Sequence, residues 1–455
     1  MTTLRVLKFG GSSVGASERL IRVTDLIARE MALGPVAVVV SAMGDTTDWL
    51  IDAAHAAERG EQTAAEALVE RVGQVAVDVG LAALRELLRR PGRDESVPMP
   101  ELPTQVSELL VPLRQVLAGV GLLRQCSAQT LDLVLSFGER LSAGIVAALL
   151  RVRGQAAVAV DAREWMVTDD RFGDALVDEP ATRAHLAALA PTWAPAIAVH
   201  TGFLGATPDG RTTTLGRNGS DYTATLLAGA IGASEVQIWT DVPGVMTGDP
   251  TILRDAYPIA RMSYQEALEL ANFGARLFHP RTMVPLIEGR IVLRIRSTMD
   301  PESEGTRIDE GGSPTAGPTC VTSLENLALL DIRWRRLTHT AGVGMRVLRA
   351  LESAGVTVWM ANQAAHGQAV AVVVPAAAAA KAAAAIDAEL ALERSRGEVD
   401  SPGVRQPITL LTLVSGRMDP RTAPSQFFRA LGQVGVPVRA IAQGMSSRSI
   451  SCAID

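Results

Sequence analysis

The sequence has little cysteine and no long apolar leader. Its 455 residues include three cysteines, which lie far apart in the chain at Cys126, Cys320 and Cys452. This spacing fits no metal-binding pattern and indicates reduced thiols inside a cell. No uninterrupted apolar run reaches the roughly 18 residues that a membrane helix needs, and the N-terminus lacks the apolar core of a signal peptide. We therefore expect a cytoplasmic protein with no membrane partner.

An excess of basic charge is also missing. The chain carries 43 lysines and arginines against 49 acids, for a net charge of −6, and it shows no basic stripe. This balance argues against nucleic acid as a partner. The six histidines contain no His-x-x-x-His pair, so we predict no metal site made by protein ligands. The apolar fraction of 47% is enough for a sizeable core, in a chain long enough for several domains.

The first 300 residues alternate short apolar runs with longer stretches of helical periodicity. Buried strands are predicted at 4–9, 36–42, 157–162, 196–203, 235–241 and 291–297. Helical patterns lie between them, and residues 60–130 are helical around a proline-rich break. Such alternation predicts an α/β domain over 1–300, with a mostly parallel central sheet between helices.

The remaining chain has a different organisation. Residues 301–319 combine glycine, proline and acids without periodicity, which is typical of a domain linker. Beyond them a strand–helix–strand–strand pattern occurs twice, once in 320–400 and once in 401–455. We therefore predict two copies of one small α/β unit. The alanine-rich run at 375–393 reads as a strong helix signal without a function of its own.

The first candidate site is "LKFGGSS" at 7–13. Lys8 interrupts an apolar strand at its carboxyl end, where open α/β sheets bind ligands. Gly10 and Gly11 let the backbone approach a ligand, and free amides at the following helix start attract anions. The spacing is neither a Walker loop nor a dinucleotide fingerprint. Lys8 could equally pack its stem and extend its head into water, so these residues alone leave a phosphate site open.

The second candidate is the polar stretch "GRTTTLGRNGSDY" at 210–222. Arg217, among glycines, would suit a bidentate clamp on a carboxylate. Ser220 or Asp221 could cap the helix that follows, but a cap needs one such residue and leaves the rest of the polarity unexplained. Polarity this dense before a buried helix favours a site.

Further candidates lie at element ends. The pair Thr240–Asp241 ends a strand before a Pro–Gly turn, and Glu139 is interpreted as an acid in the first turn of a helix. Ser263 and Glu266 have the spacing of a capping box, so we assign both to structure. The remaining site candidates are Arg276 and His279.

Taken together, these stretches resemble the aspartate kinases of the amino acid kinase family. The motifs "KFGGSSV", "FGERLS", "GFLGATPDGRTTTLGRNGSDYTA", "IWTDVPGV" and "FGARLFHPRT" occur in the family's order over almost the whole chain. "RNGSDY" and "IAQGMSSRSIS" look most like the kinase part of fused aspartate kinase–homoserine dehydrogenases. The resemblance implies an amino acid kinase fold followed by two ACT-type regulatory units. It also implies phosphorylation of the side-chain carboxylate of L-aspartate by ATP with Mg²⁺, to give 4-phospho-L-aspartate.

The resemblance also assigns roles to individual residues. The implied phosphate- and nucleotide-binding residues are Lys8, Gly10, Gly11, Ser12, Thr240, Asp241 and Arg276. The implied residues that hold the amino acid are Thr47, Glu139, Arg217 and Ser220. Lys8 and Asp221 are the implied catalytic residues. Phosphoryl transfer depends mostly on positioning and on cationic stabilisation of phosphoryl oxygens, a role that suits Lys8.

Three positions on the nucleotide side depart from the family pattern. Met246, Thr251 and Arg276 stand where relatives usually have tyrosine, arginine and lysine. A guanidinium replaces an ammonium as a charge but not in shape. A same-fold kinase for another amino acid or carboxylate, and a catalytically weak regulator that binds an amino acid, therefore stay open as alternatives.

The resemblance of the tail to ACT domains implies control by threonine or lysine. The second copy's "AIAQGMSSRSI" fits an effector loop, with Gln443 as a ligand candidate. The first copy reads "MANQAAHGQAV", which includes Gln363, where relatives usually place a serine-rich, acid-containing stretch. Our hypothesis is weakened or retuned feedback inhibition. Because ACT units bury sheet edges by pairing, we also expect a homodimer or a larger homo-oligomer.

Overall fold

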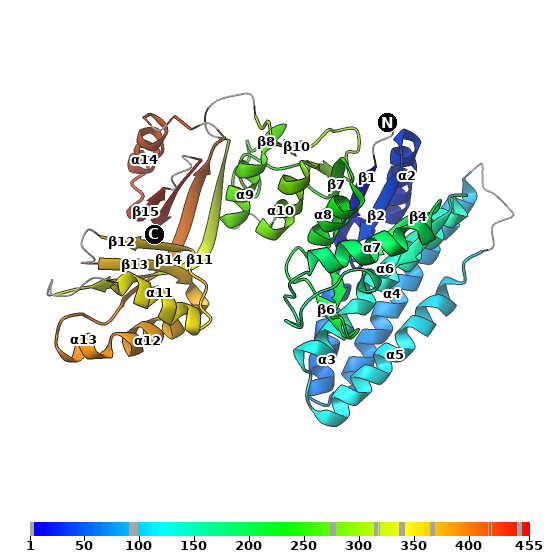
Figure 1. Ribbon diagram of the computed structural model, residues 1–455, viewed down its shortest axis with the longest axis horizontal. Coiled ribbons are helices and arrows are strands. Elements are labelled where there is room, and N and C mark those ends of the chain that lie inside the picture. Colours follow the sequence, from blue (N-terminus) through cyan, green and yellow to red (C-terminus); the bar gives the residue numbers. More distant parts are fainter. Residues whose placement is uncertain are drawn as a thin grey trace. The chain divides into compact units, whose positions relative to one another are not determined.

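The chain forms two compact units in its computed structural model (Figure 1). The first comprises Met1–Val245 and His279–Glu310, and the second comprises Met246–Phe278 and Gly311–Asp455. This division differs from the predicted boundaries at 300 and 319, because residues 246–278 group with the later part of the chain. The structure describes residues 4–90, 99–273, 279–313, 317, 319–335, 342–364, 369–416, 418–419, 421–443 and 448–455.

The first unit is built on a mostly parallel sheet. Its strand order is β3 (Ala157–Val160), β4 (Ile197–Thr201), β2 (Val36–Val40), β1 (Arg5–Phe9), β7 (Glu235–Thr240), β9 (Val292–Ser297) and β10 (Thr306–Asp309). The strands from β3 to β9 are parallel, and β10 is antiparallel to β9. The six predicted strands are confirmed. The stretch predicted as a linker contains β10, whose Thr306 and Ile308 are buried in strand alternation.

Helices cover both faces of this sheet. On one face, Leu7 and Phe9 of β1 join a large core with helices α2 (Ser17–Leu33) and α6 (Ala128–Val152). On the other face lies α8 (Gly219–Ile231), which contacts β1, β2 and β7. Because strand side chains alternate between faces, Lys8 points away from Leu7 and Phe9, toward α8.

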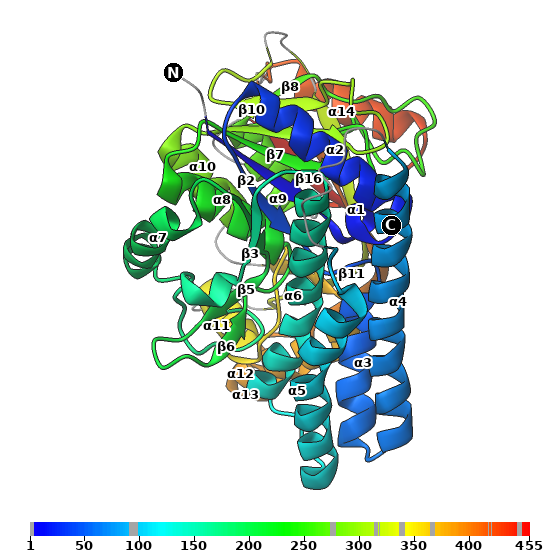
Figure 2. The same cartoon turned by 90° about the vertical axis from the view of Figure 1, so that its right-hand side faces the viewer.

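A group of long helices extends from the core side of the sheet. Helices α3 (Thr46–Glu58), α4 (Gln62–Arg89) and α5 (Leu102–Leu123) pack beside α6 (Figure 2). By length and composition, α5 and α6 could each cross a membrane. The most apolar window of α6 is 83% buried within the protein, and that of α5 is 28% buried. The expectation of no membrane partner stays a prediction.

The rest of the first unit lies around α8. Helices α7 (Glu179–Trp193) and α10 (Pro280–Gly289) both contact α8, and the short α1 (Gly11–Val14) follows β1. Strands β5 (Leu204–Ala206) and β6 (Thr212–Thr214) form a separate antiparallel hairpin. β6 contacts α6, so the hairpin is attached to the core helix.

The second unit contains one six-stranded sheet made by the two predicted copies. The first copy has β11 (Cys320–Arg333), α11 (Val343–Ser353), β12 (Met360–Gln363) and β13 (Ala369–Pro375). The second has β14 (Gly403–Val414), α14 (Ala423–Gln433), β15 (Val438–Gln443) and β16 (Ser449–Ile454). The strand order β12-β13-β11-β14-β16-β15 joins the copies through their first strands, which are antiparallel. This arrangement is consistent with paired ACT-type units.

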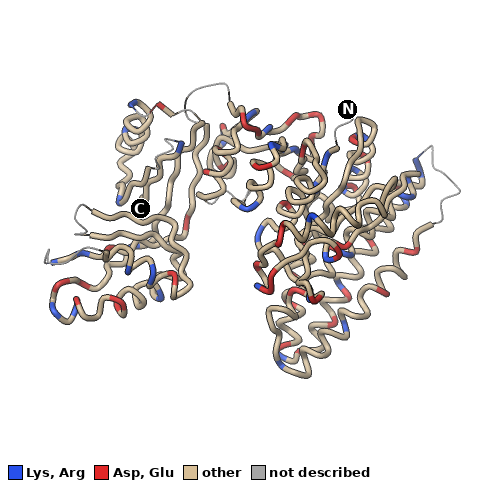
Figure 3. The backbone as a smooth tube through the Cα atoms, in the orientation of Figure 1, with Lys and Arg blue, Asp and Glu red and all other residues tan. Residues whose placement is uncertain are grey.

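Other elements of the second unit follow the expected pattern in part. The alanine-rich run forms α12 (Ala379–Glu389) and α13 (Ala391–Ser395). After β8 (Arg261–Ser263), α9 (Tyr264–Asn272) begins with the predicted capping box, in which Ser263 and Glu266 bond reciprocally. Figure 3 shows basic and acidic residues interspersed along both units.

Candidate active site

The centre of the candidate site is a buried ion pair at the carboxyl end of β1. The Nζ of Lys8 lies 2.6 Å from Oδ1 of Asp221, and each side chain is only 9% exposed. β1 supplies the lysine, and the first turn of α8 supplies the carboxylate. The two predicted catalytic residues are therefore in direct contact.

The glycine loop after β1 passes close to this pair. A Cβ on Gly10 would lie 3.6 Å from Lys8 Nζ, an ordinary contact, whereas a Cβ on Gly11 would lie 2.8 Å from the carbonyl oxygen of Ala42. The amide of Gly44 also donates to the carbonyl of Gly11 at 3.1 Å. Gly11 is therefore required by close approach of two backbone segments, and this approach fixes the loop beside Lys8. The half-buried Ser12 follows in α1.

The start of α8 excludes the capping alternative for Ser220 and Asp221. Neither Ser220 nor Asp221 caps the helix, because the cap position is Asn218, in a left-handed conformation with φ of 56°. Both predicted residues instead lie in the first turn and are buried. The hydroxyl of Ser220 shares a 2.7 Å hydrogen bond with the hydroxyl of Ser41, at the end of β2. The first turn of α8 is thus held against the carboxyl ends of β1 and β2.

Glu139 is also placed differently from the prediction. Helix α6 begins at Ala128, capped by the Ser127 side chain, so Glu139 lies in the middle of the helix and not in its first turn. The helical periodicity of residues 128–137 extends the helix upstream of the expected start. Glu139 is 4% exposed and accepts a 3.2 Å bond from the amide of Ala42 at Oε1, while its Oε2 has no hydrogen-bond partner among the described residues.

Burial raises the pKa of Glu139 to about 8, against the opposing effects of the Ala42 amide and of the positive charge of Lys8. A buried carboxylate with an unpartnered oxygen favours a cationic ligand, because such a ligand would restore its ionisation. Glu139, Lys8 and Asp221 thus form one electrostatically connected group at the carboxyl end of the sheet.

The remaining predicted site residues of the first unit lie around this group. Thr47 is in the first turn of α3, which begins two residues after Gly44. Thr240 ends β7 and its hydroxyl donates to Asp241 at 3.1 Å. The carbonyl of the preceding residue, Trp239, accepts from the amide of Gly10 at 3.4 Å. Thr240 and Asp241 therefore adjoin the glycine loop.

Arg217 is exposed, and it lies in the loop between β6 and α8. Its charge helps to lower the pKa of His279, although burial is the larger cause. His279 caps α10, with Nδ1 accepting from the amide of Arg281 at 3.3 Å. The structure thus gives His279 a capping contact and leaves the guanidinium of Arg217 at the surface of the unit.

Other predicted residues lie outside this group. Arg276 belongs to residues 274–278, which are outside the described part of the chain. Met246 forms an isolated bridge with Pro258, and Thr251 bonds to the Asp249 carboxylate through its amide and its hydroxyl. The two effector candidates are on strands of the second unit, Gln363 on β12 and Gln443 on β15.

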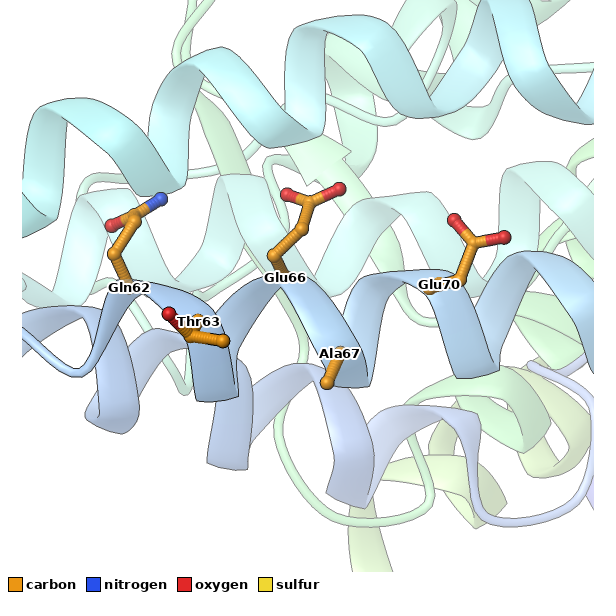
Figure 4. Close-up of a pocket in the computed structure, with 5 residues that line it drawn as sticks. All are labelled: Gln62, Thr63, Glu66, Ala67 and Glu70. Atoms are coloured by element: carbon orange, nitrogen blue, oxygen red, sulfur yellow. The ribbon is translucent and has the colours of Figure 1, made fainter.

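A shallow hollow lies elsewhere on the first unit, on α4. Figure 4 shows Gln62, Glu66 and Glu70 on the same side of that helix. Arg114 of α5 bonds to Glu66 at 2.6 Å and to Glu70 at 2.9 Å, so both acids are paired. None of the predicted site residues lines this hollow. Among the described residues, no group of three His, Cys, Asp or Glu side chains could hold a metal ion.

Two polar residues near the site were not singled out from the sequence, Ser41 and Asp132. Ser41 follows β2 as Gly10 follows β1, and this position at a strand's carboxyl end was a usable signal. Asp132 is buried on α6, seven residues before Glu139 and so on the same helix face. An acid within the apolar run "LDLVLSF" was the only available sign of its role.

Comparison with known sequences gives a consistent family. Residues 3–297 match the model of the amino acid kinase family. The chain is 36% identical over 359 residues to aspartokinase 1 of Arabidopsis thaliana, covering 78% of this chain and 60% of that protein. It is 30% identical over 457 residues to the bifunctional aspartokinase/homoserine dehydrogenase of Haemophilus influenzae, covering 99% of this chain and 54% of that protein. The chain therefore spans a little over half the length of these relatives.

Two solved structures of E. coli aspartokinase III share the fold at 28% identity. The R-state complex with aspartate and ADP has a TM-score of 0.80, with 99% of this chain and 96% of that chain covered. The T-state complex with lysine and aspartate has a TM-score of 0.73, with coverage of 99% and 95%. In both cases the likeness extends through the first and second units.

Proposed function

The chain belongs to the amino acid kinase family, and on that basis we propose that it transfers the γ-phosphoryl group of ATP to the side-chain carboxylate of L-aspartate. The observation that carries this proposal is the contact of Lys8 with Asp221 beside the glycine loop, with Glu139 buried close by. The whole-chain likeness to an aspartokinase solved with aspartate and ADP supports the same reaction.

In the proposed reaction, an oxygen of the substrate's side-chain carboxylate attacks the γ-phosphorus, and the bond to ADP breaks. Lys8 is suited to stabilise the phosphoryl oxygens, because an ammonium has three donors and its ion pair with Oδ1 of Asp221 cannot use them all. Asp221 holds Lys8 in place, and Gly10 permits an approach of the phosphate to within reach of Nζ. Positioning and charge stabilisation supply most of the catalysis in such a transfer.

A second set of residues would hold the ammonium and the α-carboxylate of the amino acid substrate. Glu139 would bind the substrate ammonium, whose positive charge would lower the pKa of the carboxyl and ionise it. Arg217 is proposed to clamp the α-carboxylate in a bidentate manner. Thr47 and Ser220 complete the substrate contacts. These roles fit a substrate that carries a cationic and an anionic group on one carbon.

The nucleotide would lie at the carboxyl ends of β1 and β7. Gly10, Gly11, Ser12, Thr240 and Asp241 are the proposed contacts among the described residues. Because those residues contain no ready-made metal cage, Mg²⁺ would enter bound to the ATP phosphates, as it commonly does. The exposed carboxylate of Asp241 is an oxygen donor of the kind that Mg²⁺ takes, and the metal would neutralise phosphate charge.

We further propose that the second unit binds an amino acid effector, lysine or threonine, between β12 and β15. Asn362 donates to the carbonyl of Ile441 at 2.7 Å, which brings the strands of Gln363 and Gln443 together. A Cβ on Gly344 would lie 2.4 Å from Oε1 of Gln363, so this carboxamide lies against the first turn of α11. Pairing of such units between chains would give the expected homo-oligomer, which light scattering would measure.

A coupled ADP-release assay tests the proposed activity. The purified protein is given ATP and Mg²⁺ with aspartate, glutamate, close analogues or no acceptor. Release with aspartate alone supports the proposal. Release with another acid supports a same-fold kinase of different specificity. If no acceptor gives ADP release, a weak regulator is supported. Either result contradicts the proposal.

A further inference from the structure

Asp132 of α6 is a buried carboxylate whose bonds all go to one neighbouring region. Its Oδ2 accepts from the amides of Gly173 and Thr214, each at 2.9 Å, and its Oδ1 accepts from the hydroxyl of Thr214 at 2.8 Å. The carboxyl is 1% exposed, and burial raises its pKa. The amide of Ala175 donates to the carbonyl of Thr214 at 2.9 Å, so Asp132 holds two chain segments that also hold each other.

The segment Thr214–Ser220 forms an arch whose two ends are attached near α6. Thr214 is bonded to Asp132, as described above. At the other end, Ser220 bonds to Ser41, and the next residue, Ala42, donates to Glu139. Asp132 and Glu139 are seven residues apart, about two helical turns or roughly 10 Å along the helix axis. Gly216 has a positive φ, so the chain from Thr214 to Arg217 is not fully extended and spans at most roughly 10 Å.

The middle of the arch passes close to Asp174. Gly216 has φ of 73°, and a Cβ there would lie 2.7 Å from Oδ1 of Asp174. Asp174 in turn forms a two-bond ion pair with Arg281 of α10, at 2.6 Å and 3.2 Å. The backbone immediately before Arg217 thus follows a segment bonded to Asp132 of α6 and passes close to an acid that is paired with α10.

We propose that Asp132 is a positioning residue for the amino acid substrate: it fixes the arch so that Arg217 meets the α-carboxylate at the distance set by Glu139. This inference rests on the proposed function, in which Glu139 and Arg217 bind opposite charges of one substrate. One face of α6 then sets both ends of the amino acid site. The end of the arch next to Asp221 is bonded separately, through Ser220 to Ser41, so loss of the Asp132 bonds at Thr214 should act mainly on Arg217 and less on Lys8.

The test compares Asp132→Ala and Asp132→Asn with the unchanged protein. Alanine removes all three bonds, whereas asparagine retains them, with its carbonyl accepting from the two amides and its amide donating to the Thr214 hydroxyl. Thr214→Val removes the hydroxyl bond alone and serves where the alanine variant folds poorly. Ser127→Ala is the matched control, because it removes a hydrogen-bonded cap from the same helix without touching the arch.

Asp132→Ala should raise KM for aspartate by about tenfold or more, while KM for ATP and kcat at saturating aspartate stay within about threefold. Asp132→Asn should stay within about threefold of the unchanged protein in all three constants, and Thr214→Val should fall between them. An unchanged KM for aspartate in Asp132→Ala would overturn the proposal. Equal rises in both KM values, or an asparagine variant as impaired as the alanine variant, would also overturn it.

Hydrogen exchange separates this inference from the proposed function. If the unchanged protein fails to release ADP with aspartate, the proposed function is contradicted. The attachment of the arch to Asp132 can still be measured. Amides of residues 171–175 and 212–217 should exchange at least about tenfold faster in Asp132→Ala and at the original rate in Asp132→Asn. Unaltered exchange in Asp132→Ala would show that Asp132 does not hold the arch.

Discussion

Lys8 and Asp221 form an ion pair of 2.6 Å that joins the end of β1 to the first turn of α8, with nine-tenths of each side chain buried. A buried pair of this kind contributes little net stability, because both charges lose their hydration. Loss of one partner is costly, since the other charge is then buried alone. Loss of one partner alone should therefore lower stability, whereas loss of both should cost less; catalysis should depend on Lys8 in either case.

Replacing Lys8 with alanine should lower kcat by at least about 100-fold and leave aspartate binding nearly unchanged. The reason is that the ammonium acts on charge that develops during transfer and not on the bound amino acid. Steady-state ADP release and calorimetric titration with aspartate measure the two quantities. Unchanged turnover would remove Lys8 from the mechanism.

The double variant Lys8→Ala/Asp221→Asn separates chemistry from folding. Lys8→Ala alone should lower the free energy of unfolding by about 3 kcal/mol, because Asp221 is left without its countercharge. The additional Asp221→Asn change should restore much of that loss and none of the activity. Denaturant unfolding of the three proteins gives the comparison, and recovered activity in the double variant would contradict the assignment.

Aspartate binding should strengthen as the pH rises toward the pKa of Glu139. Burial raises that pKa to about 8, and only the ionised form attracts the substrate ammonium. Below that pH, Kd for aspartate should fall by up to about tenfold per unit of rising pH. Glu139→Gln should bind weakly at every pH and lose this dependence. A pH-independent Kd in the unchanged protein would contradict the role of Glu139.

The raised pKa of Glu139 also predicts that the folded protein loses stability as the pH rises. The pKa of Glu139 in the folded protein lies above its value of 4.5 in a model peptide, so folding favours the protonated form. The associated stability is fully present below about pH 4.5 and is lost as the pH rises through about 8. Glu139→Gln should therefore unfold at a higher denaturant concentration than the unchanged protein at pH 8.5, and the difference should shrink at pH 5.

Gly11→Ala should destabilise the protein and reduce its activity. The added Cβ would lie 2.8 Å from the Ala42 carbonyl oxygen, a backbone atom that cannot rotate away. Relief of this contact would move the glycine loop from Lys8, at a cost of about 1–3 kcal/mol. Gly144→Ala is the matched control, since nothing lies within 4 Å of a Cβ there and alanine favours the helix. Equal thermal stability of the two variants would contradict the prediction.

Much of the fold follows from local sequence patterns. The strands of the first unit are continuous apolar runs, and their order in the chain with intervening helices specifies a parallel sheet. The repeated strand–helix–strand–strand order in the second unit is likewise readable, as is the Ser263–Glu266 capping box. These features are local, so a single segment contains the information.

Contacts between distant segments were not readable. Asp132 bonds to Thr214, 82 residues away, and Ser41 bonds to Ser220, 179 residues away. Neither partner carries a pattern that points to the other. The predicted start of α6 was wrong because the helix is buried on most sides. Such burial hides the amphipathic period that marks a helix boundary. Lys8 could be predicted as a site candidate because its charge interrupts an apolar strand.

Lysine and threonine should inhibit the protein weakly. Inhibition at micromolar concentrations in the ADP-release assay would contradict the hypothesis of weakened feedback. Whatever inhibition occurs should be reduced by Gly344→Ala, because a Cβ at that position would displace the carboxamide of Gln363. Gly432→Ala, on α14 of the second copy with nothing within 4 Å of a Cβ, tests for nonspecific effects of the added methyl.

His200 is buried in the first unit, where two tryptophan rings lie nearly perpendicular to its imidazole ring. The ring centroids of Trp165 and Trp193 lie 5.6 Å and 5.0 Å from that of His200, in T-shaped arrangements. Burial lowers the pKa of His200 to about 3, so the folded protein keeps the ring neutral.

Acid should therefore destabilise the protein through this residue. The unfolded chain takes up a proton near pH 6.5, while the folded chain does so near pH 3, so stability falls as the pH drops between these values. The slope contributed by His200 is at most about 1.4 kcal/mol per pH unit. His200→Phe retains an aromatic ring between the tryptophans and should unfold with a shallower dependence on acid. Denaturant unfolding at pH 7.5, 6 and 5 compares the two proteins, and parallel curves would mean that the charge on His200 does not limit acid stability.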